Sequence, residues 1–97
     1  NIVTKSTLPY LKEKGITVGP VPTSGALYVT FLEKPDNLDY IALYNTSGQM
    51  IANQRGSNID GSNRFTFDLV NEPNGVYFVK LIYRNTKAKT YKIIKVN

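Results

Sequence analysis

Cysteine, histidine and tryptophan are absent from this chain of 97 residues, and methionine occurs once. Without histidine and cysteine, the chain lacks the usual ligands for zinc and copper, the usual general base and the thiol nucleophile, and it forms no disulfide. It also lacks any apolar run of about eighteen residues, so we predict no membrane-spanning segment. These absences disfavour metal-dependent and cysteine-dependent catalysis, and no cofactor is predicted.

The first residues, 1–5, lack the apolar core of a secretory signal peptide. If the protein is exported, we expect its signal upstream of Asn1, or expect the chain to be part of a longer protein. Residues 1–14 show no lasting hydrophobic period and contain Pro9, so we predict a linker or pre-domain segment there and one domain over residues 15–97. A chain of this length buries only about two thirds of its unfolded surface, which predicts a thin core without a deep pocket.

Negative charge is missing from the end of the chain. The net charge is +5, yet residues 1–76 hold seven acids and six bases, whereas residues 77–97 hold six bases and no acid. Such a basic end suits an acidic partner, a membrane surface or nucleic acid, or it is a solvated strand face. We expect no nucleic acid, because the aromatic residues alternate as core residues do and no recognised binding motif occurs.

The residues present in quantity favour strands. Seven Tyr, four Phe and many Val and Ile suit the half-buried surface of a pleated sheet. Alternation with a period of two predicts inward-facing sets separated by turns rich in Gly, Pro, Asn and Asp. The predicted inward residues are Leu27, Val29 and Phe31, then Ile41 and Leu43, then Phe65, Phe67 and Leu69, and finally Tyr77, Val79 and Leu81.

Two strands are predicted to hold distinct positions. Residues 16–21 form a short edge strand broken by Pro20 and Pro22. Residues 76–84 are apolar on both faces, which predicts a strand in the middle of a sheet, covered on both sides. With a hairpin over 40–54 and a last strand over 89–96, the chain is predicted to be all-β, an antiparallel immunoglobulin-like sandwich of about seven strands.

Four short motifs follow one another in order. They are Val21-Pro22-Thr23-Ser24-Gly25, then Ile41-Ala42-Leu43-Tyr44-Asn45 with Ser47-Gly48-Gln49, then Asp68-Leu69, and last the run 73–81 closed by residues 89–96. Over about residues 16–97 this order resembles the C-terminal sorting domain (the Por secretion system tail) of type IX secretion cargo in Bacteroidetes. The first motif departs from the family's Tyr-Pro-Asn-Pro, because this sequence has Val18-Gly19-Pro20-Val21-Pro22.

The resemblance implies a sorting signal on an exported protein, here called the address, and not an enzyme. In that family an N-terminal cargo domain passes through the periplasm, and a type IX outer-membrane shuttle recognises the sorting domain. A sortase-like protease then removes the domain, here in the linker before Gly15, and the cargo stays at the cell surface or outer membrane or is secreted. The implied recognition residues are Gly75, Val76, Tyr77, Val79, Lys80, Lys89, Lys92, Ile94, Lys95 and Val96, with Pro20, Pro22, Thr23 and Gly25 in the N-terminal motif.

Structural roles compete with recognition at these positions. Gly75 is first a turn residue, and Tyr77 and Val79 belong to an alternating set that packs in a core. The four lysines of the set are either receptor contacts or solvated charges that keep an open sheet edge from pairing with another molecule. Self-association through such an edge is a further alternative.

Other functions stay open as alternatives. A cell-surface binding or adhesive module, or an uncleaved domain that is the ligand of another envelope protein, would use exposed tyrosines. An enzyme would need a pair of carboxylates, and calcium would need the acidic loop 36–39, which lacks the twelve-residue spacing; neither is predicted. The tyrosines are Tyr10, Tyr28, Tyr40 and Tyr44, and the acidic pairs are Asp36 with Asp39 and Asp60 with Asp68.

Overall fold

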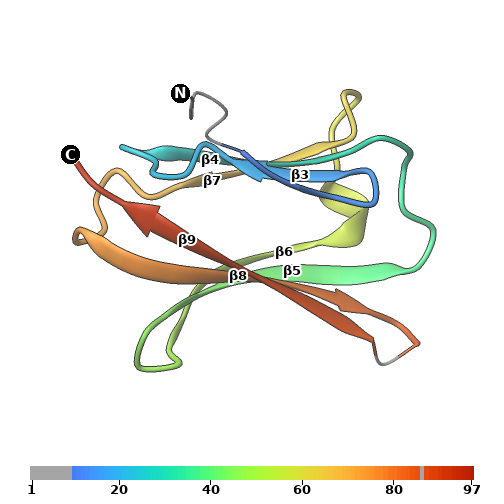
Figure 1. Cartoon of the computed structure of the whole chain (residues 1–97). Helices are drawn as coiled ribbons and strands as arrows, with labels where there is room; N and C mark the ends of the chain where they lie inside the picture. Colours follow the sequence, from blue (N-terminus) through green and yellow to red (C-terminus); the bar gives the residue numbers. More distant parts are fainter. Residues whose placement is uncertain (1–9, 86) are drawn as a thin grey trace.

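The computed structural model describes residues 10–85 and 87–97, which form two four-stranded antiparallel sheets packed face to face (Figure 1). Within these ranges no helix is long and apolar enough to cross a membrane. The prediction of an all-β antiparallel sandwich is confirmed. The elements are β2 (Leu11–Glu13), β3 (Ile16–Gly19), β4 (Ala26–Phe31), β5 (Leu38–Asn45), β6 (Met50–Arg55), the 3₁₀ turn η1 (Gly56–Asn58), β7 (Arg64–Asp68), β8 (Gly75–Tyr83) and β9 (Ala88–Lys95).

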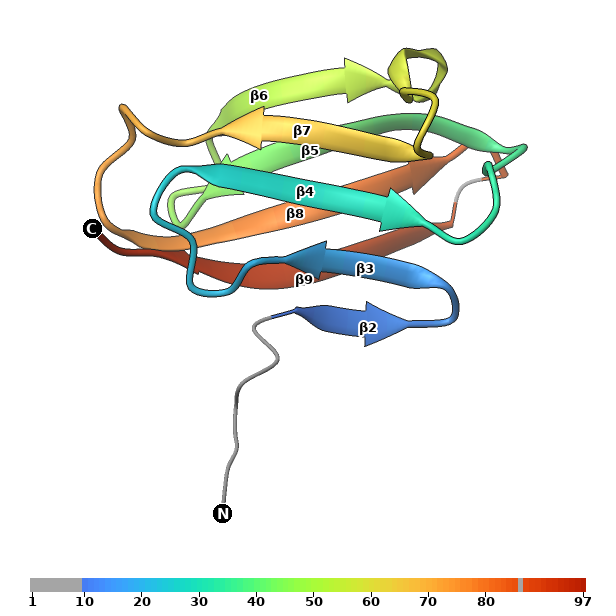
Figure 2. The ribbon, with the colours of Figure 1, turned by 90° about the horizontal axis from the view of Figure 1, so that it is seen from above.

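The two sheets have the strand orders β2-β3-β4-β7 (sheet 1) and β6-β5-β8-β9 (sheet 2). Figure 2 looks down on sheet 1, with sheet 2 beneath it. Strands that follow one another in sequence pair within a sheet at β2-β3, β3-β4, β5-β6 and β8-β9. The connections β4 to β5, β6 to β7 and β7 to β8 pass from one sheet to the other, so each sheet contains strands from both halves of the domain.

The core lies between the sheets and is formed by the residues that alternate inward. All four inward-facing sets predicted from the sequence are buried there, and Phe31 meets Phe65 edge-on with ring centroids 6.0 Å apart. Val18 of β3 and Ile93 of β9 join them from the two sides. Each Å² of apolar surface removed from water stabilises the folded state by about 25 cal/mol, so burial of this single layer of side chains holds the two sheets together.

One strand forms where a linker was predicted. Leu11–Glu13 pairs with β3, because Lys14 and Gly15 both take positive φ, 48° and 81°, and reverse the chain in two residues. Such a turn matches the twist of a hairpin, but its usual sequence is Asn-Gly or Asp-Gly, so Lys14-Gly15 gave little signal. The remainder of the predicted linker, residues 1–9, lies outside the described residues, and the domain boundary at residue 15 stays a prediction.

Two predicted strand environments are wrong. The segment from Ile16 is not an edge strand, because β2 covers one side of β3 and β4 the other. The strand β8 does lie mid-sheet, between β5 and β9, but only its inner face is buried. Its outer face, with Val76, Phe78 and Ile82, is half-buried, since no third layer packs on sheet 2 within the part of the chain that the structure describes.

A candidate recognition surface at one end of the sandwich

Most of the predicted motif residues meet at one end of the sandwich, where the chain also ends (Figure 1). We call this the motif end; it comprises the loops 20–25, 45–49 and 69–75 and residues 94–97. The opposite end comprises the loops 14–15, 32–37 and 56–63 and residues 84, 85 and 87. The motif end joins segments that are far apart in sequence, because each sheet contributes loops to it.

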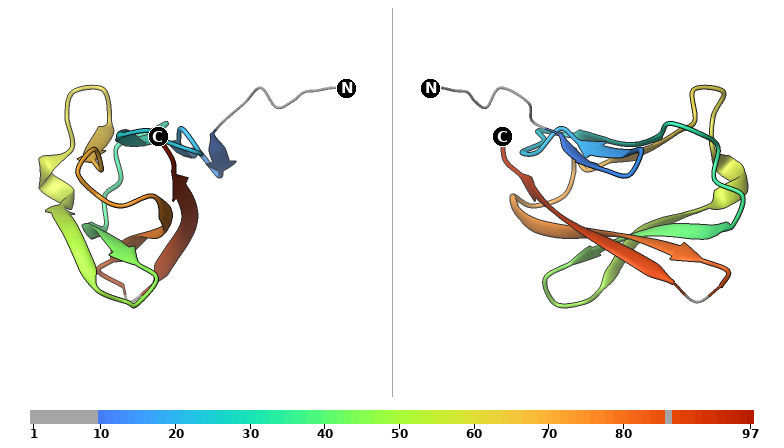
Figure 3. Two further views of the ribbon diagram at one scale, coloured as in Figure 1. Left: turned by 90° about the vertical axis from the view of Figure 1, so that its left-hand side faces the viewer. Right: turned by 45° about the vertical axis from the view of Figure 1, so that its right-hand side comes forward.

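A backbone bridge ties the N-terminal motif to the last strand. The N–H of Thr23 donates to the carbonyl of Ile94 at 2.8 Å, and the N–H of Val96 donates to the carbonyl of Thr23 at 2.9 Å, which makes a parallel bridge between Thr23 and Lys95. We call this bridge the clasp. Figure 3 shows the end of β9 rising from sheet 2 toward sheet 1, where it meets the loop before β4. The clasp therefore closes the sandwich at the motif end.

The side chain of Thr23 fixes the loop that makes the clasp. Thr23 is 1% exposed, and its hydroxyl accepts a hydrogen bond from the N–H of Gly25 at 3.1 Å and donates to the carbonyl of Ala26. The peptide bonds before Pro20 and Pro22 are cis, and the Gly25 carbonyl accepts from the N–H of Leu69 at 2.9 Å. The N-terminal motif is thus a tightly held turn with little free backbone.

Lys95 is buried, so the expectation that all four lysines are exposed is wrong at this position. Its side chain is 2% exposed, and Nζ donates to the carbonyl of Glu72 at 2.8 Å. The alternation of β9 explains the burial, because Lys95 shares the inner face with Tyr91 and Ile93. At the strand's end its stem crosses apolar surface and its ammonium reaches a loop carbonyl.

The turn before β8 is held by its own hydrogen bonds. Gly75 has a φ of 151°, which side-chain-bearing residues rarely adopt, and it is the first residue of β8, paired with Lys95, so it lies where the predicted turn passes into the strand. The hydroxyl of Tyr77 donates to the carbonyl of Pro73 at 2.6 Å. Burial, with a smaller effect of Glu72, raises the pKa of Tyr77 above its usual range, so this donor stays protonated.

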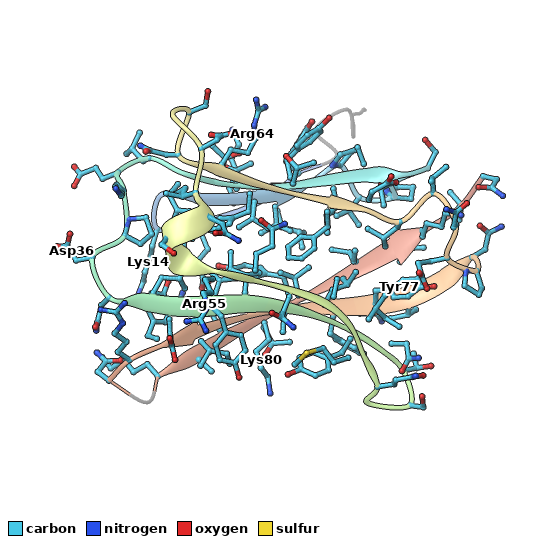
Figure 4. The ribbon with its side chains drawn as sticks, turned by 180° about the vertical axis from the view of Figure 1, so that it is seen from behind. Lys14, Asp36, Arg55, Arg64, Tyr77 and Lys80 are labelled. Carbon is cyan, nitrogen blue, oxygen red and sulfur yellow. The ribbon has the colours of Figure 1, made fainter. Side chains whose placement is uncertain are left out.

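The other predicted lysines have three different environments. Lys80 extends from the outer face of sheet 2, with Nζ 5.7 Å from the ring centroid of Tyr44 (Figure 4). Lys89 lies at the opposite end of β9, where Nζ is 2.6 Å from Oε1 of Glu13. Lys92 alone among the four has an exposed side chain. The predicted row is therefore reduced to Lys80 and Lys92 on the outer face.

Glu13 connects β2 to β9 across the open side of the sandwich. Its Oε1 accepts hydrogen bonds from Nζ of Lys89 and, at 3.3 Å, from the hydroxyl of Tyr91. The Lys89 ammonium lowers the pKa of Glu13. Burial, together with the negative charge of Glu13, raises the pKa of Tyr91 to about 12. Sequence reasoning missed Glu13, because its partners lie 76 and 78 positions further on.

The remaining recognition residues divide between core and surface. Val79 is fully buried, whereas Val76 is half-buried on the outer face of sheet 2. Ile94 and Val96 are 39% and 43% exposed, which is high for large aliphatic side chains beside a fixed backbone. Of the fourteen predicted residues, four are buried, namely Thr23, Tyr77, Val79 and Lys95, and four are exposed, namely Pro22, Lys92, Ile94 and Val96; the others are half-buried.

Two sets of residues considered for other functions, the pair Asp60 and Asp68 and the tyrosines, are spread over separate parts of the sandwich. Asp60 precedes β7 and Asp68 ends it, and each carboxylate accepts hydrogen bonds from backbone N–H groups of its own turn. In the described ranges no three acids form a group suited to a metal ion. The Arg64 guanidinium lies 5.0 Å from the ring centroid of Tyr28 on sheet 1, whereas Tyr40 and Tyr44 belong to sheet 2. These tyrosines do not form one sugar-binding patch.

Comparison with known proteins adds family and fold. The family model described as "Secretion system C-terminal sorting domain" matches residues 17–96. Among solved structures, the chain is similar to a DUF3244 family protein with an immunoglobulin-like β-sandwich fold from Bacteroides vulgatus. The two share 18% identity with a TM-score of 0.66, over 84% of this chain and 85% of that one. No curated protein matches significantly. The immunoglobulin-like form of the predicted sandwich is confirmed.

Proposed function

The chain belongs to the secretion system C-terminal sorting domains, and from that membership we propose that it is the address by which the type IX machinery carries an N-terminal cargo across the outer membrane. The surface that is read is the C-terminal hairpin, residues 75–96, together with the loop 20–25 that it meets. After transit through the periplasm the cargo is left at the cell surface or released.

The clasp is the observation that supports this proposal best. It joins Thr23 to Ile94 and Val96, so the two ends of the family motif become one surface only when both sheets have assembled. A linear tail would not need such a bridge. We therefore propose that the shuttle recognises the folded domain, with the exposed Ile94 and Val96 among the contacts.

Removal by a sortase-like protease is the second part of the proposal. We place the cut N-terminal to β2, in residues 1–10, because losing β2 would leave the backbone of β3 unpaired. A protease cuts unpaired backbone most readily. The three residues of β2 are exposed, but their backbone is paired with β3, so they would be a poor substrate.

A fusion experiment tests the address. The 97-residue chain is joined to the C-terminus of a neutral periplasmic reporter in a type IX host, beside a fusion that stops after Asn74 and one carrying Lys34→Ala in an exposed loop of the opposite end. We expect the full fusion and the Lys34→Ala fusion at the surface, and the truncated fusion in the periplasm. Periplasmic retention of a folded, intact full fusion would contradict the proposal.

Mass spectrometry of the surface reporter tests the cut separately. A new C-terminus within residues 1–10 is expected. A reporter that reaches the surface with the domain still attached would refute removal while leaving the address in place, and would favour the alternative of an uncleaved domain that binds another envelope protein.

A further inference from the structure

We propose that β9 is a docking strand, onto which an acidic, extended segment of a partner protein adds as a fifth strand of sheet 2. The proposal names a partner chemistry for the sorting domain and, as a statement about export, rests on the proposed function.

The backbone of β9 has a free side over about half its length. β9 ends sheet 2, with β8 as its neighbour. The carbonyl of Ile94 points away from β8, because it accepts a hydrogen bond from Thr23. Backbone groups of an edge strand point outward at every second residue, so those of Lys92 and Thr90 also point away from β8. Apart from the clasp, β9 pairs with β8 alone within the described ranges, so these outward groups are open to a partner strand.

The other edges are shorter or occupied. β2 has three residues, and its middle residue is Lys12. On the far side of the sandwich, Nε2 of Gln54 in β6 donates to the carbonyl of Thr66 in β7 at 2.6 Å, which blocks an outward group of β7. β9 has eight residues, and the clasp takes up only its last part. Proteins usually protect an edge of this length, so an open one is a ready template for β-strand addition.

Charge selects the partner. β8 and β9 contain no acidic residue, and Lys80 and Lys92 lie on the outer face that a fifth strand would extend. Lys92 is the exposed one of the two and lies on β9 itself, whereas Lys80 lies on β8 with Nζ 5.7 Å from the ring centroid of Tyr44. Pairing β9 with β9 of a second copy would place both Lys92 side chains on one face of a common sheet, directly opposite each other in the register centred on Lys92, and like charges on neighbouring strands destabilise a sheet. An acidic segment is favoured over self-association for this reason.

The inner side of the docking strand sets a second requirement. Glu13 lies there, bound to Lys89 and near Tyr91. Partner side chains that point toward β2 must therefore be neutral, because an acid would meet Glu13. The fitting segment alternates acidic residues on its outer face with apolar residues on its inner face.

The test uses the 15N-labelled 97-residue chain and the synthetic peptide acetyl-Thr-Glu-Val-Glu-Val-Glu-Thr-amide, followed by NMR titration. We propose that the added strand runs antiparallel to β9, as β8 does. In an antiparallel pair the residues that exchange hydrogen bonds face one another and lie on the same face, so the Glu residues would bond to the backbone of Thr90 and Lys92. We expect saturable shifts at the amides of Ala88, Thr90 and Lys92. Methylating the Glu nitrogens should abolish them, whereas methylating the Val nitrogens should leave them. A peptide with Lys in place of Glu should not bind.

Charge reversal supplies the matched variants. Lys92→Glu should weaken the Glu peptide at least roughly tenfold and admit the Lys peptide, whereas Lys34→Glu, at the opposite end, should leave the Glu peptide's affinity within about twofold. Amide dispersion in the same spectra shows that each variant is folded. The proposal is overturned if the Glu peptide does not bind or if the shifts map to β2 or β6. It is also overturned if methylating the Glu nitrogens and methylating the Val nitrogens change binding equally.

Export separates this inference from the proposed function. If the fusion with Lys92→Glu reaches the surface as the unmodified fusion does, while truncation after Asn74 blocks export, the docking strand is wrong as an export contact and the address stands. If the unmodified fusion itself is retained while the peptide binds at β9, the proposed function fails and the docking strand stands as a binding site.

Discussion

The two ends of the sandwich are built from similar turn residues, but their loops are held in different ways. At the motif end, hydrogen bonds join Thr23 to Ile94 and Val96, Lys95 to Glu72, and Tyr77 to Pro73. At the opposite end the loop 32–37 is largely exposed, and Leu32 is 80% exposed. Backbone hydrogen bonds join distant segments at this end too, since the N–H groups of Phe31, Leu32 and Arg84 donate to the carbonyls of Asn63, Gly15 and Asn37. The ends differ in their buried polar side chains, because the two found among the described residues, Thr23 and Lys95, both lie at the motif end.

The difference shows what the family motif encodes. Thr23 and Lys95 help to close the sandwich, and at 1% and 2% exposed they have little surface open to a partner. Recognition then falls to residues that the closed end holds in place, such as Ile94 and Val96. A sequence motif of this kind specifies a folded surface. Three substitutions test whether the two ends differ as described, and a fourth tests a contact outside both ends.

The largest effect is expected from Lys95→Ala at the motif end. The change removes a buried aliphatic stem and a charged hydrogen bond to the Glu72 carbonyl, so it should lower the free energy of unfolding by about 2–4 kcal/mol. Lys95→Met keeps the volume of the stem and should cost less than about 1.5 kcal/mol. Urea unfolding measures both; equal losses for the two variants would show that the ammonium, not the stem, holds this end.

Gly56→Ala tests whether the opposite end has any fixed point. A Cβ there would lie 2.2 Å from the carbonyl oxygen of Leu38, which is backbone and cannot turn aside. We expect a loss of about 1–3 kcal/mol in urea unfolding. Gly61→Ala in the same loop is the matched control, because a Cβ at residue 61 meets nothing within 4 Å, and it should change stability by less than about 0.5 kcal/mol.

Thr23→Ala should loosen the clasp without removing it. The hydroxyl that fixes the loop is lost, while the backbone bridge to Ile94 and Val96 stays possible, so about 1–2 kcal/mol is expected. Thr23→Ser keeps the hydroxyl and should lose less. Hydrogen exchange of the Val96 amide gives the local readout: it should quicken in Thr23→Ala more than in Thr23→Ser. Unchanged exchange in Thr23→Ala would mean that the clasp does not depend on the threonine side chain.

Much of the fold could be predicted from the sequence because its signals are local. Alternation identified the inward residues of β4, β5, β7 and β8, and a strand's period of two makes such sets readable without a structure. The same rule, applied to Tyr91, Ile93 and Lys95, would have placed Lys95 inside. Lys95 was instead predicted on the surface because lysine side chains are usually exposed. Here the aliphatic part of the side chain is buried while the ammonium group donates to the carbonyl of Glu72.

The candidate site could be predicted only in part, because its main contacts are long-range. Nothing near Thr23 in the sequence indicates that its backbone binds Ile94 and Val96, and nothing near Glu13 indicates Lys89. β2 was missed for a related reason, since a three-residue strand has too short a pattern to read. Order of motifs along the chain gave the family, while their meeting at one end needed the structure.

The smallest effect is expected from removing the contact between Glu13 of β2 and the side chains of β9, which lies at neither end. Its contribution to stability depends on pH. The pKa of Glu13 is lowered in the folded chain, so its stabilisation is present above the unfolded value near 4.5 and is lost as pH falls through the lowered folded pKa. The pKa of Tyr91 is raised to about 12, so its stabilisation is present below pH 10 and is lost as pH rises through about 12.

Glu13→Gln should therefore flatten the acid side of a plot of Tm against pH. It should also make the alkaline decline smaller, with the same onset near pH 10 and an earlier end, because the Glu13 charge no longer raises the pKa of Tyr91. The change in Tm is expected to be the smallest of the four, since an exposed ion pair is screened by solvent. Glu33→Gln, in an exposed loop of the opposite end, is the control and should keep the acid side unchanged. If both variants flatten the acid side equally, the effect comes from overall charge. The position of β2 then depends on its pairing with β3 and not on the contact between Glu13 and β9.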